Sequence, residues 1–279
     1  MPGIDPNEFR LWARYVHDIS GITLEPAKAY LIESRLVPLL KEYACRTLSD
    51  LYQKSRSDGT RTLEKRIIDR ITTHETFFFR DPALFEMLKH HLLPDILGRK
   101  KQNAFSASPV PVRIWCAGCA TGQEVYSVAM AAKEIRLDPD MHLSVLGTDI
   151  SDTAIARARQ GTYRRIETDR GLTSGQLERF FTRQGDAWKI SDEIRAMTTF
   201  KKMNLMRPFA GLGRFDIIFC RNVAIYFTVD DRKKLFRHIA EALTADGGLI
   251  IGATETLTDI APWFEPRRHF GPVFYRMRE

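Results

Sequence analysis

One stretch of the chain, VRIWCAGCATGQE at residues 112–124, limits the possible folds more than any other. Residues 112–116 read as a short buried strand, residues 117–122 as a loop of small residues, and a helix is predicted from Gln123. Glycine lets a backbone approach a ligand closely, and a helix start presents N–H groups that lack helical partners. The loop has no Gly-Lys-Ser/Thr phosphate sequence, and Ala120 stands where G-x-G-x-x-G needs its second glycine. The stretch therefore predicts a ligand-cradling loop of another kind, with a plain βα turn as the alternative.

The next predicted strand, residues 142–147, leads to an acidic residue, Asp149. An acid at the end of the strand after a glycine loop is where a ribose is held, because one carboxylate accepts hydrogen bonds from both sugar hydroxyls. Further strands are predicted at 215–220, 249–252 and 273–275, with helices at 152–160 and 229–243, the latter ended by residues 246–248. Such alternation predicts an α/β fold with a doubly wound, mainly parallel sheet. Its ligand should lie at the carboxyl ends of the strands, where the Gly118 loop, Asp149 and Asn222 converge.

The rest of the pattern divides the chain into domains. Residues 1–75 carry apolar side chains at helical spacing and predict a helical N-terminal domain. Residues 76–110 predict a linking helix, over about 83–97, and a solvated linker rich in Gly, Ser and Pro. Residues 111–279 form the sheet domain, interrupted over about 163–203 by an insertion that contains a hairpin and then a strand at 199–203.

Composition sets broad limits. With 44% apolar and 28% charged residues the chain is typical of soluble globular proteins. It has no apolar run of membrane length, no signal-peptide core in residues 1–20 and only 4 scattered cysteines, so we expect a cytoplasmic protein without membrane insertion. Cys116 and Cys119 are spaced like half a zinc site, but no second pair follows at ligand spacing, and we expect no metal. The formal net charge of +7 permits an acidic partner without choosing among nucleic acid, membrane surface and protein.

Five segments carry a resemblance to a known family through their order and spacing. They are TTHETFFFRD at 72–81, WCAGCATGQEVYS at 115–127, Thr148-Asp149-Ile150, Asn204-Leu205, and RNVAIYF at 221–227. With them the chain resembles the chemotaxis receptor methyltransferases, which move a methyl group from S-adenosylmethionine to glutamate side chains of chemoreceptors. The resemblance covers essentially the whole chain. It implies a Rossmann-like S-adenosylmethionine methyltransferase domain with a small antiparallel β insertion, preceded by an all-α domain that docks on the receptor.

The resemblance also implies which residues contact S-adenosylmethionine or the product S-adenosylhomocysteine. They are His74, Thr76, Arg80, Glu124, Asp149, Asn204, Leu205, Arg221 and Asn222, and the glycine loop adds Gly118 to the predicted cofactor site. The family often has Asn where this chain has His74. It often has Glu-Glu-Pro where this chain has Gln123-Glu124-Val125, so Glu124 carries the acidic role of that pair.

The implied partners are the cytoplasmic methylation helices of chemoreceptors. The turn Gln184-Gly185-Asp186 in the insertion is shorter than in members that bind a tethering peptide at the receptor C-terminus. We therefore expect no binding of a receptor C-terminal pentapeptide, and no nucleic acid partner.

The chemistry needs few groups. A glutamate γ-carboxylate has an unperturbed pKa of about 4.3 and is an anionic nucleophile at neutral pH, so transfer from a sulfonium requires no general base. Arg80 is the candidate for holding a carboxylate of cofactor or substrate, unless it pairs with Glu75 or Asp81. Tyr226 is the second catalytic candidate, with a core aromatic as the alternative, and Asn222 has a strand-end cap as its alternative.

Two other functions compete with receptor methylation. One is a catalytically silent adaptor that binds an adenosyl ligand on the same fold. The other is a nucleic-acid methyltransferase, which the positive charge favours. Amino-group enzymes of that class often carry Asn/Asp-Pro-Pro-Tyr/Phe after the fourth strand, where this chain has Arg221-Asn222-Val223-Ala224.

The helical domain carries a set of basic residues between its apolar positions. They are Lys28, Arg35, Lys41, Arg46, Lys54 and Arg56. We predict that all of them face outward, either as a docking surface for an acidic receptor or only as a solvated surface.

Overall fold

The structure is a computed structural model that describes residues 4–102, 110–135, 141–268 and 271–278. The N-terminal part is a small helical bundle: α1 (Pro6–Ser20), the 3₁₀ helix η1 (Pro26–Lys28), α2 (Ala29–Glu42), α3 (Leu48–Ser57) and α4 (Thr62–Ile71). Asp5 caps α1 by accepting from two backbone N–H groups. The apolar stripes of the helices meet in a core of their own around Trp12, Ile32 and Leu36.

A helical arm connects the bundle to the sheet. It comprises α5 (Pro82–Met87), a π-helical turn η2 (Leu88–Leu92) and α6 (Leu93–Gln102). The predicted linking helix over 83–97 is therefore present, but it carries a π turn and runs five residues further, to Gln102. The first residues of the predicted linker belong to this helix, and the next ones, 103–109, lie outside the described part of the chain.

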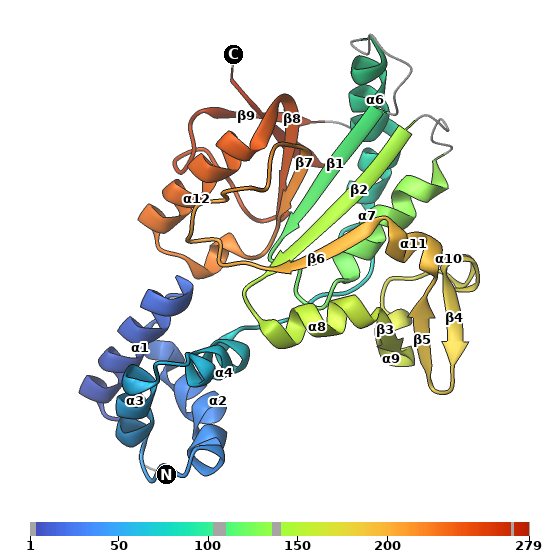
Figure 1. Cartoon of the computed structure of the whole chain (residues 1–279). Helices are drawn as coiled ribbons and strands as arrows, with labels where there is room; N and C mark the ends of the chain where they lie inside the picture. Colours follow the sequence, from blue (N-terminus) through green and yellow to red (C-terminus); the bar gives the residue numbers. More distant parts are fainter. Residues whose placement is uncertain (1–3, 103–109, 136–140, 269–270, 279) are drawn as a thin grey trace.

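The large sheet has seven strands in the order β6-β2-β1-β7-β8-β10-β9 (Figure 1). Their bounds are β1 (Val110–Ala117), β2 (Met141–Asp149), β6 (Thr198–Lys202), β7 (Phe215–Cys220), β8 (Leu243–Ile251), β9 (Phe264–Arg268) and β10 (Val273–Met277). Neighbours from β6 to β8 pair in parallel, and β10 pairs antiparallel with both β8 and β9. The predicted turn at 246–248 falls inside β8, because the register shifts between Phe215 and Ile217 and leaves extra residues of β8 unpaired there.

Helices cover both faces of the sheet, which confirms the doubly wound prediction (Figure 1). Alternate residues of one strand enter opposite cores: Ile114 of β1 joins the core beneath α6 and α7 (Gln123–Glu134), and Trp115 joins the core beneath α12 (Val229–Ala242). Every residue of β7 is buried, as expected for a strand covered on both faces. Since the strands share one polarity, the carboxyl ends of β1, β2 and β7 meet at a single edge.

The insertion between α8 (Asp152–Gln160) and β6 forms a separate three-stranded antiparallel sheet in the order β3-β5-β4. It comprises β3 (Thr162–Arg164), α9 (Arg165–Thr168), α10 (Ser174–Phe180), β4 (Phe181–Gln184), β5 (Ala187–Ile190) and α11 (Asp192–Ala196). The predicted hairpin is present as β4 and β5, whereas β3 is an addition. The predicted insertion of 163–203 extends too far, because β6 pairs along β2 in the large sheet.

Direct hydrogen bonds join the bundle to the sheet domain. The Thr23 N–H donates to the Tyr226 carbonyl at 2.8 Å, and the Asn204 side-chain amide donates to the Ile19 carbonyl at 3.1 Å. On α4 the Asp69 carboxylate accepts from the Ser151 hydroxyl at 2.6 Å. The two domains therefore face one another at the carboxyl edge of the sheet.

Candidate active site

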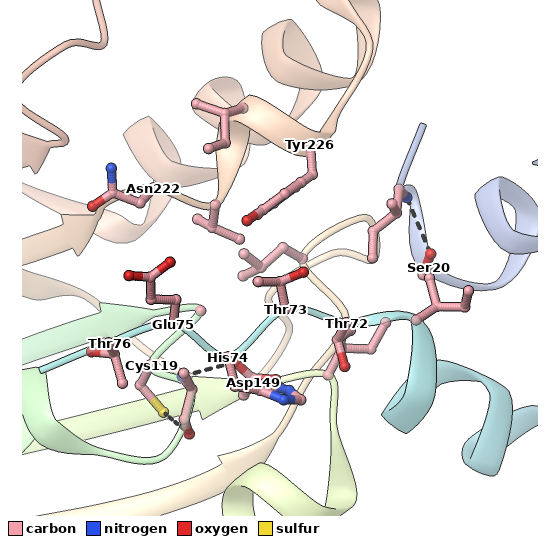
Figure 2. Close-up of a pocket in the computed structure, with 18 of the residues that line it drawn as sticks. Ser20, Thr72, Thr73, His74, Glu75, Thr76, Cys119, Asp149, Asn222 and Tyr226 are labelled. Carbon is pink, nitrogen blue, oxygen red and sulfur yellow. Dashed lines mark hydrogen bonds and ion pairs between the residues drawn. The ribbon is translucent and has the colours of Figure 1, made fainter. Parts of the chain in front are cut away.

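A cavity of about 480 Å³ lies between the helical bundle, the segment that follows α4 and the carboxyl ends of β1, β2 and β7. Its wall includes every residue that the sequence analysis assigns to the cofactor or to catalysis: His74, Thr76, Arg80, Gly118, Glu124, Asp149, Asn204, Leu205, Arg221, Asn222 and Tyr226. Figure 2 shows part of this wall, with the Tyr226 hydroxyl pointing into the cavity and the His74 and Asp149 side chains close to one another across from it.

The loop after β1 is fastened to the end of β2. The N–H groups of Gly118 and Cys119 both donate to the Thr148 carbonyl, at 2.8 and 2.9 Å, and the Ala120 N–H donates to Asp149 at 2.9 Å. Gly118 has φ +75, and a Cβ there would lie 2.9 Å from Val223, so the position requires glycine. These loop amides therefore hold the neighbouring strand end rather than pointing free toward a ligand.

Asp149 is buried at the centre of this arrangement. Its Oδ2 accepts from Ala120 and its Oδ1 accepts from the Ser151 N–H, each at 2.9 Å. Each carboxylate oxygen has lone pairs for more than one hydrogen bond, so capacity for two hydroxyl donors remains. His74 Nε2 lies 4.0 Å from Asp149 Oδ1, and within the described residues it is buried without a hydrogen-bond partner. A polar ligand group at this point would satisfy that nitrogen.

Arg221 is a buried cation whose side chain is only 2% exposed. It pairs with Glu124 on α7 at 2.7 Å and with Asp81, and it also donates to the Arg80 carbonyl at 3.2 Å. Burial alone would lower the pKa of Arg221, but the charges of Glu124 and Asp81 outweigh burial and raise it. Arg221 therefore ties α7, through Glu124, and the segment after α4, through Asp81 and the Arg80 carbonyl, to the end of β7.

Arg80 also lines the cavity but, unlike Arg221, it has no carboxylate partner among the described residues. Its guanidinium lies 5.7 Å from the ring centre of Phe77 and is 3.4 Å from the Glu75 carbonyl oxygen. In the part of the chain that the structure describes, no carboxylate forms an ion pair with Arg80, and Asp81 pairs with Arg221 instead. The alternative that Arg80 pairs with Glu75 or Asp81 is therefore not observed, and the guanidinium lines the cavity with its charge available.

Asn222 and Tyr226 follow β7 on the opposite wall, Tyr226 within the 3₁₀ turn η3 (Ala224–Tyr226). Asn222 has φ +55, and its N–H donates to Glu255 at 3.0 Å. The same Glu255 oxygen accepts from the Gly252 N–H at 2.6 Å, so one carboxylate ties the ends of β7 and β8 together. Tyr226 is half-buried: it packs against the core beneath α12 and also lines the cavity.

Asn204, Leu205 and Thr76 complete the set of expected residues. The Asn204 side-chain amide donates to the Ile19 carbonyl, and the Asn204 Oδ1 accepts from the Met206 N–H at 2.9 Å. The Asn204 side chain therefore links the two domains. Leu205 is buried and Thr76 is half-buried on the cavity wall.

Three side chains outside the expected set organise the site. Asp81 holds Arg221, Glu255 holds two strand ends, and Arg35 donates to the Ile71 and Thr72 carbonyls and to the Thr73 hydroxyl. Arg35 is therefore half-buried against the segment after α4, which corrects the prediction that it faces outward. Asp81 stood inside the TTHETFFFRD segment and could have been found there, whereas no local pattern marks Glu255.

Three of the four cysteines, Cys116, Cys119 and Cys220, are core residues of the strands and the loop, whereas Cys45 is half-buried in the helical bundle. Burial raises the pKa values of the Cys116, Cys119 and Cys220 thiols well above the usual range, which disfavours the reactive thiolate. Across the described ranges, no group of three His, Cys, Asp or Glu side chains is arranged to hold a metal ion. The same ranges contain no helix with the length and apolar character needed to cross a bilayer.

A doubly wound sheet with a buried carboxylate at the end of its second strand, beside a cavity at the carboxyl edge, defines the class of nucleoside-binding α/β domains. The comparison with family models agrees and is more specific. Residues 74–269 match the model described as "CheR methyltransferase, SAM binding domain", and residues 7–72 match "CheR methyltransferase, all-alpha domain". The chain belongs to the CheR methyltransferase family.

Relatives match along nearly the whole chain. A chemotaxis protein methyltransferase of Vibrio anguillarum is 36% identical, over 99% of this chain and 98% of its own length. Chemotaxis protein methyltransferase 1 of Vibrio cholerae is 35% identical over the same shares, and chemotaxis protein methyltransferase 1 of Pseudomonas aeruginosa is 32% identical over 97% and 98%.

The residues present fit S-adenosylmethionine. The cavity volume of about 480 Å³ lies in the usual range for small-molecule sites, roughly 300–1,000 Å³. The remaining acceptor capacity of Asp149 suits a ribose diol, the unsatisfied His74 nitrogen suits a polar group beside it, and Leu205 and Phe85 supply apolar wall.

Proposed function

We propose that this protein methylates glutamate γ-carboxylates of chemoreceptors with S-adenosylmethionine as the methyl donor. The geometric observation that carries the proposal is the Arg80 guanidinium, which lines the cofactor cavity without a carboxylate partner among the described residues. A cation placed there can bind a carboxylate, of either the cofactor or the acceptor. The names of the relatives, which are chemotaxis protein methyltransferases over both domains, support the chemotactic substrate.

When bound, S-adenosylmethionine supplies a methyl group on a sulfonium, which a carboxylate can accept to give a methyl ester and S-adenosylhomocysteine. The chain's contribution is then binding and alignment. Asp149 holds the ribose, with His74, Thr76, Gly118, Asn204, Leu205 and Asn222 around the rest of the cofactor, and Arg221 with Glu124 fixes the wall behind it. Arg80 and Tyr226 are our candidates for the catalytic residues, the first by holding a carboxylate and the second by directing its hydroxyl at the acceptor. No side chain has to remove a proton, because the acceptor is already ionised.

Transfer of labelled methyl groups tests the proposal against the silent adaptor. The purified chain, tritiated S-adenosylmethionine and a panel of receptor cytoplasmic fragments should give label on the fragments that is released by base, as carboxyl esters are. A chain that binds S-adenosylhomocysteine and transfers no label to any fragment is an adaptor instead. We place the reaction in the cytoplasm, where the methylation helices of chemoreceptors lie.

A further inference from the structure

The wall of the cofactor cavity divides into a buried floor and an exposed mouth. Asp149, Leu205 and Arg221 are buried. The exposed residues of the wall are Thr23, Lys28 and Tyr30 from the bundle, Thr73 and Glu75 from the segment after α4, and Ile225 from η3. Both domains therefore border the opening through which an acceptor side chain has to enter.

Two of the mouth residues are large and apolar. Tyr30 on α2 is 61% exposed and Ile225 on η3 is 54% exposed. The other large apolar side chains that are exposed in the described chain are Leu11, Val37, Ile166 and Val229, and none of these lines the cavity. Exposed apolar side chains that lie singly on a surface need no explanation, but two at the opening of one site, one from each domain, indicate a contact surface.

The acceptor explains why such a surface is needed. A glutamate side chain is short, so the main chain of the acceptor protein has to contact the mouth of the cavity before the carboxylate can enter. If the acceptor lies on a helix, the residues three and four positions away share its face and meet the mouth with it. We propose that Tyr30 and Ile225 form an apolar clamp that positions the methyl-accepting helix by apolar residues three or four positions from the acceptor glutamate. This inference rests on the proposed function.

Charge at the mouth suits the same occupant. Lys28 is exposed beside Tyr30 and can meet an acidic helix. The Glu75 carboxylate, which would repel that helix, lies 3.3 Å from Arg170 and is offset by it. The clamp therefore favours a receptor helix with an apolar residue three or four positions from the acceptor glutamate. The charges around the mouth do not repel such a helix when it is acidic.

Steady-state methylation of a receptor cytoplasmic fragment tests the clamp. The variants are Tyr30→Ser, Ile225→Ser and the double variant, with Ile166→Ser and Leu11→Ser as controls that remove exposed apolar side chains elsewhere. Each clamp variant should raise the KM for the fragment by about fivefold to twentyfold, as for a buried interface side chain, and the controls should leave it unchanged. Because Ile225 adjoins Tyr226, the Tyr30 variant separates docking from catalysis. Calorimetry with S-adenosylhomocysteine should give the wild-type affinity for Tyr30→Ser, because Tyr30 lies at the exposed mouth of the cavity and is not one of the residues that we assign to the cofactor.

A second set of variants changes the receptor fragment instead of the enzyme. Replacing the apolar residues three and four positions from the acceptor glutamate by Ser should raise the KM of the wild-type enzyme, with much less effect on the double variant, because the contact is already lost. The increase should persist at high salt. Label transfer with the same KM for wild type and double variant would overturn the clamp and leave the proposed function standing. Absence of label with the wild type would remove the proposed function and the clamp with it.

Discussion

At the scale of single residues, Asp149 is held by two backbone N–H groups, which fix both of its oxygens before any ligand arrives. We predict that Asp149→Ala weakens binding of S-adenosylhomocysteine by about 2–3 kcal/mol, the usual magnitude for hydrogen bonds to a charged group. Calorimetry measures the affinity, and circular dichroism shows whether the variant is folded. A folded variant with wild-type affinity would contradict the assignment of Asp149 to the ribose.

Arg221 gives a second prediction, for stability. Its removal leaves Glu124 without its buried counter-charge, so Arg221→Met should lower the free energy of unfolding by about 3 kcal/mol. Adding Glu124→Gln removes the stranded charge and should recover roughly half of that loss. Urea unfolding of both variants and of Glu124→Gln alone provides the values. Additive effects of the two substitutions would show that the pair does not act as a unit.

Single residues of the site were predictable from the sequence where a motif places them next to a strand end. Asp149 is the last residue of β2 and Asn222 lies two residues after β7, so the polarity of the sheet brings them to one edge. The partner that holds Asn222 was not predictable from the sequence, because Glu255 lies 33 positions away in a loop without a periodic pattern. Arg35 was predicted to face outward because it lies between apolar positions of the helix. Its long side chain instead reaches the carbonyl groups of Ile71 and Thr72 at the end of α4.

At the scale of elements, the hairpin of the insertion leads to a third prediction. β4 is an edge strand of the small sheet, and the register places Gln184 opposite Ala187, so the turn between them is only Gly185 and Asp186. We predict no measurable binding of a receptor C-terminal pentapeptide, because so short a turn adds nothing to the edge that could pair with the peptide. Titration calorimetry checks this, with a family member that binds such a peptide as positive control. Micromolar binding would show that β4 pairs with the peptide despite its short turn.

Helices and buried strands of the sheet domain followed from periodicity and apolar runs, and α8 has the bounds that the sequence predicts. The errors lie where tertiary pairing decides. Residues 198–202 bury only Phe200, and only their pairing with β2 assigns them to the large sheet. β3 has just three residues, which are too few for a periodic signal. Asp246 and Gly247 were predicted to end a helix, but they lie within β8 where its pairing with β7 shifts.

At the scale of the whole molecule, the helical bundle and the sheet domain line one cavity, so the docking surface that we propose on the bundle would lie next to the cofactor site. The bundle exposes five of the six basic residues predicted to face outward: Lys28, Lys41, Arg46, Lys54 and Arg56. Charges of this kind act mainly through the rate of encounter and are screened over about 8 Å at physiological salt.

Reversing three of these charges tests the docking surface. Arg46→Glu, Lys54→Glu and Arg56→Glu together should raise the KM for an acidic receptor fragment at low salt and flatten its dependence on salt. The affinity for S-adenosylhomocysteine should stay unchanged, because none of the three lines the cavity. Steady-state methylation at low and high salt provides the comparison with the wild type. Identical salt curves would leave these residues as a solvated surface only.

The most direct test of the account places two possible acceptors in one reaction. Tritiated S-adenosylmethionine, the purified chain, a receptor cytoplasmic fragment and total RNA are incubated together, and label is counted in each acceptor before and after mild base. Transfer to glutamate carboxylates predicts label in the receptor fragment that base releases, and none in RNA above background. Base-stable label in the fragment, or label in the RNA, would contradict it.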